Sequence, residues 1–420
     1  MKKVLIIFCI LISIVLCSCN IKEHSNVDNS TYNFETDMQY YYRYQSYVNP
    51  ITASSNGYYI VGEHNIVLYV DKKTMDVAPL CNKANCKHDD PDTCNAYIIN
   101  ELMSYSPETS STKNLIQYYK GNIYVVDFQY NSSTDNYEAF LCKYDLDGTN
   151  YQIVSSTLTN FNLLSDWFIH RGYLYYTSEN EIYRLLLDNS NNKVEKILKI
   201  ENHIKGTRCI MNLLAYGNYM YFLTLEETNE ETQMKYHSLD LQNLKQKEMI
   251  YEGKEIVYCC GFVKNKVIFM LQGNNSNNSE ISYNNYYIAD LDLKNGKKLT
   301  TQKWGYNLST DGKYYYTDNA AKLDDNKKSD ENIGQIITIY NLDMEIVDSF
   351  IFPYNKIYTF LGAQDRDNFF VFLLDKNKNY NLYFIDKSNI GTFKGREAKI
   401  SKLCKLKWTD KTSENIIAMN

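Results

Sequence analysis

The chain has 420 residues, and 44% of them are hydrophobic, which is enough to build a large buried core. Its 44 Lys and Arg residues and 50 Asp and Glu residues give a formal net charge of −6. No basic patch stands out in the sequence, so we do not expect nucleic acid as a partner.

The first 18 residues have the features of a bacterial lipoprotein signal peptide. Lys2 and Lys3 precede an apolar run, residues 4–16, that is too short to span a bilayer as an uncleaved anchor. The run ends in Leu16-Cys17-Ser18-Cys19, which resembles a lipobox with Cys19 as the lipidated residue. We therefore expect a diacylglyceryl group on Cys19, and acyl chains such as palmitate that anchor the protein at the outer, extracytoplasmic face of the cell membrane.

Residues 19–37 are polar and show no periodicity, which predicts a flexible tether between the lipidated cysteine and the folded part. The following residues, 37–44, include Tyr40-Tyr41-Tyr42 and are a candidate for a strand that closes the fold. The tail, residues 409–420, is predicted to be frayed.

Two patterns recur seven times each between the tether and the tail. One is a small or polar turn followed by alternating aromatic residues, at positions 56–59, 121–124, 172–175, 217–221, 264–269, 311–316 and 366–370. The other is an apolar strand ending in aspartate, at Asp71, Asp147, Asp188, Asp240, Asp292, Asp343 and Asp386. Apart from a first step of 76 residues, these aspartates are 41 to 52 residues apart, which is the spacing of four-stranded propeller blades.

This repeat predicts an all-β protein with a single β-propeller over residues 38–408. Seven blades fit the repeat best, with six or eight as alternatives. A β-sandwich or a pair of β domains is the other interpretation. Alternating aromatic and polar residues indicate half-buried strands, and the Gly-Asn and Asp-Gly dipeptides favour hairpin turns.

The long first step contains an insertion, residues 79–97, that is rich in cysteine. Cys81, Cys86, His88 and Cys94 have the spacing C-x4-C-x-H-x5-C, and these residue types supply the four ligands of a tetrahedral structural zinc site. Disulfide bonding is the alternative, because the protein is predicted to be exported. A calcium loop formed by Asp89, Asp90 and Asp92 is a further alternative, although the usual Asp-x-Asp-x-Asp-Gly pattern is missing.

Setting Cys19 aside leaves eight cysteines in the mature chain, so complete pairing is possible. Cys142, Cys259 and Cys260 lie in strand-like runs and are also explained as buried thiols. The sequence does not choose between metal, disulfides and neither for the insertion.

The sequence carries no Gly-x-Ser-x-Gly elbow, phosphate loop or His-Glu-x-x-His motif. Residues 145–150 look like part of a calcium loop, but their place in the repeat predicts a turn. We expect His170 and Arg171 to form a satisfied surface pair, the alternative being that they face the central channel. No catalytic residue is assigned.

The order of signal peptide, lipobox, tether and propeller, with a Pro-Leu-Cys-x4-Cys-x-His-x5-Cys segment after the first blade, resembles a group of Gram-positive lipoproteins. These lipoproteins carry domains of unknown function with TolB-like or similar propeller folds. The resemblance covers most of the chain. It implies a fold and a surface location, and it transfers no activity and no site residues.

Three functions are compatible with these features. The first is a non-catalytic binding module at the cell surface for a glycan, a peptide or a protein partner. The second is a glycan hydrolase or lyase whose acids converge in the central channel. The third is a structural role in assembly of the cell envelope. The fold does not decide among them.

Overall fold

The computed structural model describes residues 32–40, 50–62, 65–99, 115–163, 165–187, 193–201, 209–227, 232–273, 283–303, 307–322, 333–352, 357–360, 366–374 and 380–406. The predicted signal peptide, Cys19, residues 20–31 of the tether and the tail from 409 lie outside these ranges. Among the helices of the described part, none has the length and apolarity needed to cross a bilayer.

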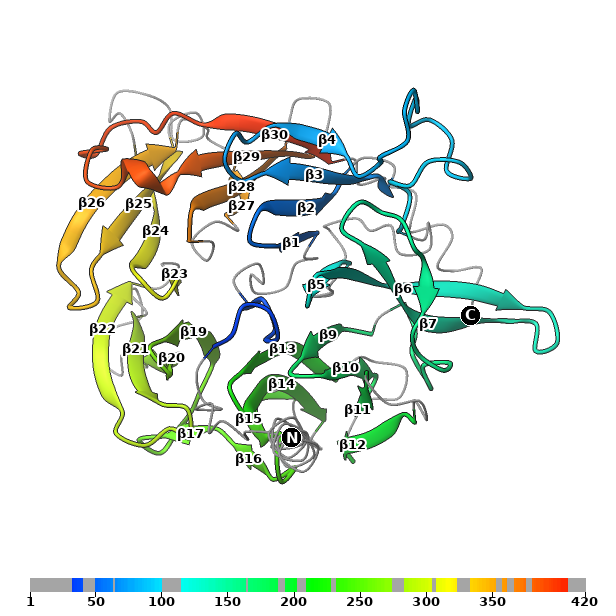
Figure 1. Cartoon of the computed structure of the whole chain (residues 1–420). Helices are drawn as coiled ribbons and strands as arrows, with labels where there is room; N and C mark the ends of the chain where they lie inside the picture. The colour runs from blue at the N-terminus through cyan, green and yellow to red at the C-terminus, as the bar shows by residue number, and fades with distance from the viewer. Residues whose placement is uncertain are drawn as a thin grey trace, which may run out of the picture.

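The described strands form seven four-stranded antiparallel sheets arranged in a ring, which is a seven-bladed β-propeller (Figure 1). This confirms the predicted fold and blade number. Each blade is built from four strands that are consecutive in the chain. A short two-stranded hairpin, β17 (Ile250–Tyr251) and β18 (Lys254–Glu255), connects the fourth blade to the fifth.

The first four blades comprise β1 (Ile51–Ala53), β2 (Gly57–Val61), β3 (Val67–Asp71) and β4 (Val77–Pro79); β5 (Gln117–Tyr119), β6 (Asn122–Asn131), β7 (Asn136–Asp145) and β8 (Gln152–Ile153); β9 (Trp167–His170), β10 (Tyr173–Ser178), β11 (Glu181–Leu186) and β12 (Glu195–Lys199); and β13 (Ile210–Tyr216), β14 (Tyr219–Glu227), β15 (Thr232–Asp240) and β16 (Gln246–Glu248). The last three comprise β19 (Tyr258–Val263), β20 (Lys266–Gly273), β21 (Tyr283–Asp290) and β22 (Lys297–Lys303); β23 (Asn307–Thr310), β24 (Tyr315–Lys322), β25 (Ile333–Tyr340) and β26 (Ile346–Phe352); and β27 (Ile357–Phe360), β28 (Asn368–Leu374), β29 (Tyr380–Asp386) and β30 (Ser401–Leu406).

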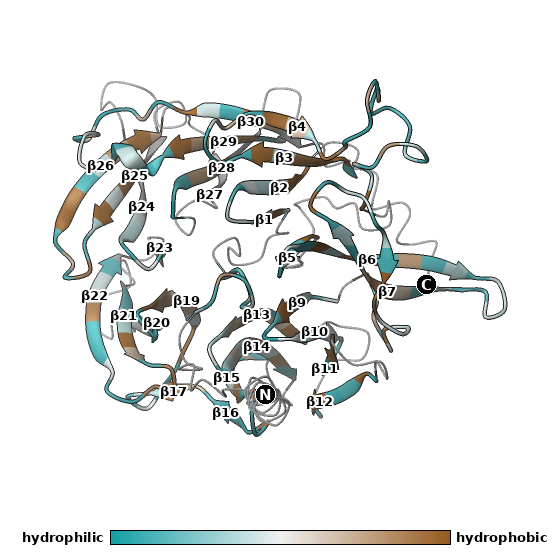
Figure 2. Cartoon of the chain, viewed as in Figure 1, coloured by the Kyte–Doolittle hydropathy of each residue, from teal (hydrophilic) through white to brown (hydrophobic). Residues whose placement is uncertain are grey.

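Burial falls from the axis of the ring toward its rim. The first strands β1, β5 and β9 are buried along their whole length, whereas the fourth strands β8 and β12 are largely exposed. Figure 2 shows the same gradient, with hydrophobic residues on β9 and hydrophilic ones on β12. The hydrophobic residues of the inner three strands therefore form the cores between neighbouring blades.

The turn between the first and second strands of a blade uses positive φ angles, as the sequence predicts. Lys120 and Gly121 have φ of 44° and 78°, and Arg171 and Gly172 have φ of 50° and 88°. Two consecutive positive φ values are the signature of a two-residue type I′ hairpin, whose twist matches that of the strands.

Tyrosine side chains connect adjacent blades through their hydroxyl groups. The buried Tyr221 of β14 donates to the carbonyl oxygen of Leu291 in the next blade at 2.6 Å. Tyr286 of β21, also buried, accepts from the backbone N–H of Leu308 at the start of the sixth blade at 3.3 Å. A buried tyrosine hydroxyl needs a partner, so these bonds fix the position of the fifth blade relative to the fourth and the sixth.

The ring closes without exchange of a strand between its ends, because the first sheet contains β1 to β4 and the last contains β27 to β30. Side chains hold the two ends together instead. The rings of Tyr58 and Phe370 lie 5.0 Å apart in an edge-to-face arrangement, and the Asn368 amide donates to the Tyr58 hydroxyl at 3.0 Å. Of the candidate closing strand at 37–44, residues 37–40 form no strand and residues 41–44 lie outside the described part.

Residues 32–40, which we call the axial segment, lie near the centre of the ring (Figure 1). Their backbone pairs with turns of two successive blades: Lys120 N–H donates to the Glu35 carbonyl oxygen at 3.1 Å, and Arg171 N–H donates to that of Thr36 at 2.7 Å. Gln39 is buried and bonds to both Thr52 and Ala53 of β1. Residues 32–37, expected to belong to a flexible tether, thus make defined contacts with the propeller.

His170 and Arg171 bind the axial segment and do not form a surface pair as expected. The Arg171 guanidinium contacts the buried Asp37 carboxylate through Nε at 2.9 Å and through Nη2 at 3.1 Å. His170 is fully buried, its Nδ1 accepts the Met38 N–H at 3.0 Å, and its Nε2 donates to the Gly217 carbonyl oxygen at 2.8 Å. These two bonds fix the neutral imidazole in one tautomer.

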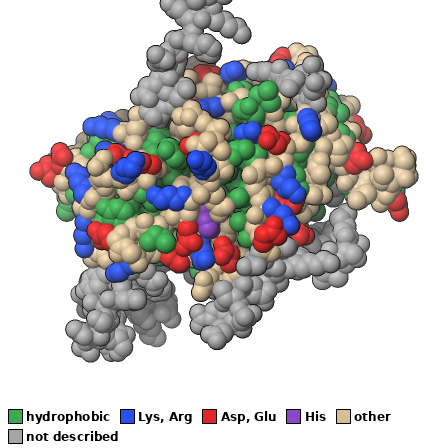
Figure 3. Space-filling model, turned by 90° about the horizontal axis from the view of Figure 1, so that it is seen from below, with side chains coloured by type: hydrophobic (Ala, Val, Ile, Leu, Met, Phe, Trp, Pro, Cys, Tyr) green, Lys and Arg blue, Asp and Glu red, His purple; other side chains and the backbone are tan. Residues whose placement is uncertain are grey.

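The rim of the ring carries both signs of charge. Figure 3 shows one edge, on which basic and acidic side chains are interspersed with hydrophobic ones. Pairs such as Arg184–Glu195 at 2.7 Å and Lys196–Glu181 at 3.0 Å bridge the outer strands of the third blade. Exposed pairs of this kind contribute little to stability, so the rim is mainly a solvated surface.

The buried His170 predicts a loss of stability in mild acid. Burial lowers the pKa of His170 from 6.5 to about 4. The nearby Asp37 carboxylate acts in the opposite direction and raises this pKa, whereas the Arg171 guanidinium lowers it further. Between these pH values the unfolded chain binds a proton that the folded chain does not, so the free energy of unfolding decreases as the pH falls, by about 3 kcal/mol for this residue. Chemical denaturation between pH 7 and pH 4 measures this change.

The matched variants are His170→Gln and His237→Gln, because burial also lowers the pKa of His237. We expect His170→Gln to flatten the dependence of stability on pH in this window, and His237→Gln to leave the contribution of His170 in place. A His170→Gln protein with the pH dependence of the parent would contradict the assigned role.

Candidate metal centre

The cysteine-rich insertion lies at the rim of the ring, between β4 of the first blade and β5 of the second (Figure 1). Beyond Pro79, which ends β4, its residues 80–97 contain no helix and no strand. Several turns shape it instead, with Asn85 and His88 in the left-handed region at φ of 62° and 56°.

All four predicted ligand residues come together in the structure. One donor atom each from Cys81, Cys86, His88 and Cys94 lies within 4.8 Å of the others, and His88 Nδ1 is 3.2 Å from Cys94 Sγ. Around a tetrahedral Zn²⁺ with bonds of about 2.3 Å to sulfur, ligand atoms are separated by about 3.8 Å. The four residues therefore fit such an ion with small adjustments of their side chains.

The turns that hold these residues depend on Asp90. Its carboxylate accepts bonds from the Asp92 N–H at 3.0 Å and the Thr93 hydroxyl at 2.9 Å, while its carbonyl oxygen accepts the Cys94 N–H at 3.0 Å. Asp90 is thus engaged in shaping the loop. In the described part of the chain, the three acids of the calcium alternative do not form a converging ligand group.

Backbone N–H groups point at two of the sulfur atoms. The Ala96 N–H lies 3.4 Å from Cys94 Sγ, and burial raises the pKa of that thiol to about 11. Burial raises the pKa of the Cys81 thiol, but hydrogen bonds from the Lys83 and Asn95 N–H groups, together with those from Cys86 and Cys94, hold it below its usual value. Such N–H groups stabilise thiolates, which are the form that binds metal.

The eight cysteines of the described part all have free thiols. The five outside the insertion, Cys142, Cys209, Cys259, Cys260 and Cys404, are buried. Burial raises the pKa of Cys142, Cys209 and Cys404 to about 12. These five are inert core residues, which confirms the interpretation of Cys142, Cys259 and Cys260 as buried thiols.

The insertion is docked on the second blade. Asn82 donates to the Asp147 carboxylate at 2.7 Å, and Asn95 donates to the Asn82 side-chain oxygen at 3.1 Å. Asp147 belongs to the turn between β7 and β8, so residues 145–150 form the turn that the repeat predicts. A Cβ atom at Gly148 would lie 2.6 Å from the Asn95 carbonyl oxygen and 2.8 Å from that of Leu80. Only glycine permits this approach of two backbones.

Two hollows flank the insertion. The first, of about 500 Å³, is lined by residues that include Tyr69, Pro79 and Cys81. The second, of about 460 Å³, lies between the insertion and the second blade and includes Cys94 and Tyr151. Because Asn82 lines both, the insertion forms a wall that the two hollows share.

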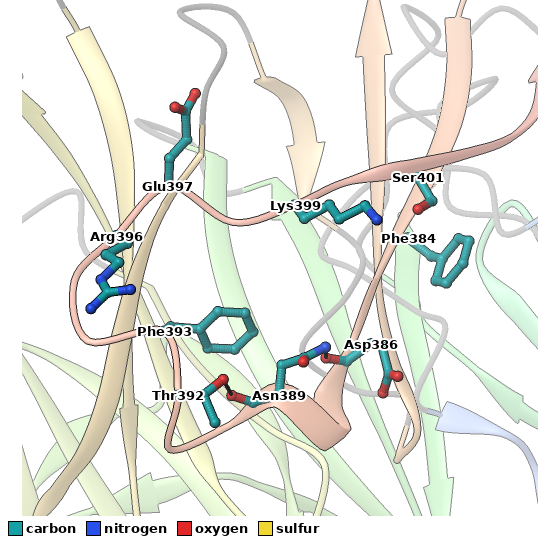
Figure 4. A pocket seen from close by; sticks show the side chains of 9 residues that line it. All are labelled: Phe384, Asp386, Asn389, Thr392, Phe393, Arg396, Glu397, Lys399 and Ser401. Carbon is teal, nitrogen blue, oxygen red and sulfur yellow. Dashed lines mark hydrogen bonds between the residues drawn. The ribbon is translucent and has the colours of Figure 1, made fainter.

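Another hollow, of about 410 Å³, lies under the loop between β29 and β30, and no pattern in the sequence predicts it (Figure 4). Phe393 points into it, and Arg396 and Lys399 lie on its edge. The loop is anchored to the sixth blade because N–H groups of Gly391, Phe393 and Lys394 donate to the Asp348 carboxylate at 2.7 to 3.0 Å.

No family model matches the chain, and no curated protein matches it. Among solved structures it is similar to the tricorn protease, with 10% identity over 89% of this chain and 36% of that chain and a TM-score of 0.49. It is also similar to the acylaminoacyl peptidase of Pyrococcus horikoshii, with 12% identity over 73% of this chain and 53% of that chain and a TM-score of 0.41. For the propeller domain of the Trilobed protease of Pyrococcus furiosus the values are 11% identity, 69% and 93% coverage, and a TM-score of 0.35. Likeness at this level concerns the fold alone.

The contact at Gly148 predicts that Gly148→Ala loosens the insertion from the second blade. The added Cβ clashes with two backbone oxygens, and alanine is also strained at the φ of +78° that Gly148 adopts. We therefore expect the free energy of unfolding to fall by at least about 2 kcal/mol. Gly121→Ala is the control, since Gly121 has the same φ but no atom within 4 Å of the added Cβ. Thermal unfolding and limited proteolysis measure both, and equal effects of the two changes would contradict the contact.

Proposed function

We propose that this protein is a lipoprotein, anchored through Cys19 to the outer face of the cell membrane, whose propeller is a non-catalytic module that binds a glycan, a peptide or a protein partner. The observation that carries this proposal is the axial segment. The chain's own residues 32–40 occupy the centre of the ring, which is where a propeller enzyme would collect its catalytic groups.

The ionisable groups that meet at the axis are engaged in structural bonds. Asp37 is paired with Arg171, and both nitrogens of His170 bond to backbone groups. A carboxylate held by an arginine is a poor general acid, and a histidine with both nitrogens occupied is a poor proton shuttle. This counts against an enzyme with its site among these residues.

The second blade, on which the insertion is docked, carries exposed aromatic residues of the kind found on binding surfaces. Tyr130, Tyr137 and Tyr151 of the second blade are 56%, 44% and 43% exposed. The Tyr151 ring lies 5.3 Å from that of Tyr144, and both line the second hollow. Exposed tyrosines offer contact area and a hydrogen-bonding tip at a small entropic cost, and they are enriched where proteins bind partners.

A binding screen tests the proposed module. The purified protein is offered soluble peptidoglycan fragments, a glycan array, a peptide library and a panel of cell-surface proteins, and we expect saturable binding to one of these classes. Tyr151→Ala should weaken that binding at least tenfold, because it removes an aromatic face of the second hollow. Met234→Ala, which changes a residue that is 62% exposed on the fourth blade, should leave it unchanged. Absence of saturable binding, or turnover of the bound compound, would contradict the proposal.

Lipidation is tested separately in a Gram-positive host grown with a palmitate analogue. We expect the wild-type protein to carry the label and to sediment with membranes, because acyl chains on Cys19 partition into the bilayer. Cys19→Ser should lose the label and leave the membrane fraction, whereas Cys17→Ser should retain both. Labelling of Cys19→Ser would refute the assigned anchor.

A further inference from the structure

We propose that Cys81, Cys86, His88 and Cys94 bind one Zn²⁺ ion, and that this ion holds the insertion in the shape that walls the two hollows at the rim. The inference goes beyond the proposed binding function, and it holds whichever ligand the hollows take.

The donor set selects the metal. Three thiolates and one imidazole form a soft ligand set that favours Zn²⁺ over Ca²⁺ or Mg²⁺, which prefer oxygen ligands. Four protein ligands leave no position open for water or substrate, so the ion has a structural role.

The arrangement of the donors favours a metal over a disulfide. A disulfide joins two sulfur atoms at about 2.05 Å, so it would involve neither the third thiol nor the imidazole. Here one donor atom from each of the four residues converges within 4.8 Å, and His88 Nδ1 is directed at Cys94 Sγ at 3.2 Å. The Ala96 N–H group is directed at the same sulfur, and hydrogen bonds of this kind orient the ligands of metal sites.

The insertion needs a stabilising link. Residues 80–99 form no strand or helix, so few backbone hydrogen bonds stabilise them beyond their turns. Cys94 is buried in the hydrophobic core shared by the first blades, and Cys81 and Cys86 pack against that core. A bound ion would tie both ends of the loop to this core and so fix its shape.

The same ion would shape the rim hollows. Cys81 lines the first hollow and Cys94 lines the second. Asn82, next to Cys81, bonds to Asp147 of the second blade. Release of the ion would free these residues, so both hollows would lose their common wall.

Metal content, thiol state and Co²⁺ spectra of the full-length protein test the proposal. We expect one zinc per chain after purification with a reductant. Replacement by Co²⁺ should give the intense visible absorption of tetrahedral cobalt with thiolate ligands. Cys86→Ser and His88→Gln should reduce the zinc content at least tenfold under dialysis against a chelator. Cys209→Ser is the control and should keep one zinc, because this buried thiol lies outside the cluster and a hydroxyl can replace its bond to the Glu179 carbonyl oxygen.

A second measurement covers variants that fail to fold. Chelation of zinc from the wild-type protein should expose residues 80–99 to limited proteolysis while the blades stay resistant. A protein that lacks metal and has a mass two units below that of the reduced chain would contain a disulfide, and this would overturn the proposal. Free cluster thiols that take up neither Zn²⁺ nor Co²⁺ would overturn it as well. Neither result would bear on the ligand screen, so the two proposals fail independently.

Discussion

The structure depends on covering both faces of every blade with its neighbours. A four-stranded sheet in this chain has hydrophobic residues on both sides of its inner strands, and only a closed ring gives each side a partner. Buried tyrosines make these contacts specific, since the hydroxyls of Tyr221 and Tyr286 bond to the following blade. The chain has 40 tyrosines, and those that are buried contribute to the packing between blades as well as to the half-buried faces of strands. Because the ends of the ring exchange no strand, Tyr58, Asn368 and Phe370 close it by side-chain contact.

The same ring creates an axis that something must occupy. The innermost strands β1, β5 and β9 are short and buried, and the axial segment buries its own Met38, Gln39 and Tyr40 near the centre of the ring. Asp37 enters this region as a buried charge, which Arg171 stabilises with two nitrogens and the Asn33 N–H and Thr36 hydroxyl stabilise with further hydrogen bonds. Because the axial segment fills space near the centre of the ring, the rim is where we propose that a ligand binds. It also connects the region that follows the predicted lipid anchor to the body of the propeller.

At the rim, the insertion after the first blade is the most distinctive local structure. It interrupts the repeat, and it is held by turns, by the core beneath Cys94 and by Gly148 of the adjacent blade. The first hollow is lined by residues of both blades and of the insertion, and the second lies between the insertion and the second blade. A ligand bound there would contact a conformation that depends on the loop. Under the two proposals, the cysteine and histidine cluster would shape the ligand site, and only Cys81 and Cys94 of the four residues line the hollows.

Much of this was determined by the sequence, because it rests on local patterns. The spacing of the aspartates fixed the blades, alternation fixed the strands, and the spacing C-x4-C-x-H-x5-C identified the four residues that converge. Only the tertiary structure showed that residues 32–37 lie near the axis and that His170 accepts the Met38 N–H. It also showed that Lys387 pairs with Asp311 at 2.7 Å and that the loop after β29 bonds to Asp348. These contacts join residues 43 to 134 positions apart. Periodicity reports which face of a strand is buried, but it carries no information on which distant residue covers that face, because the closure of the ring decides it.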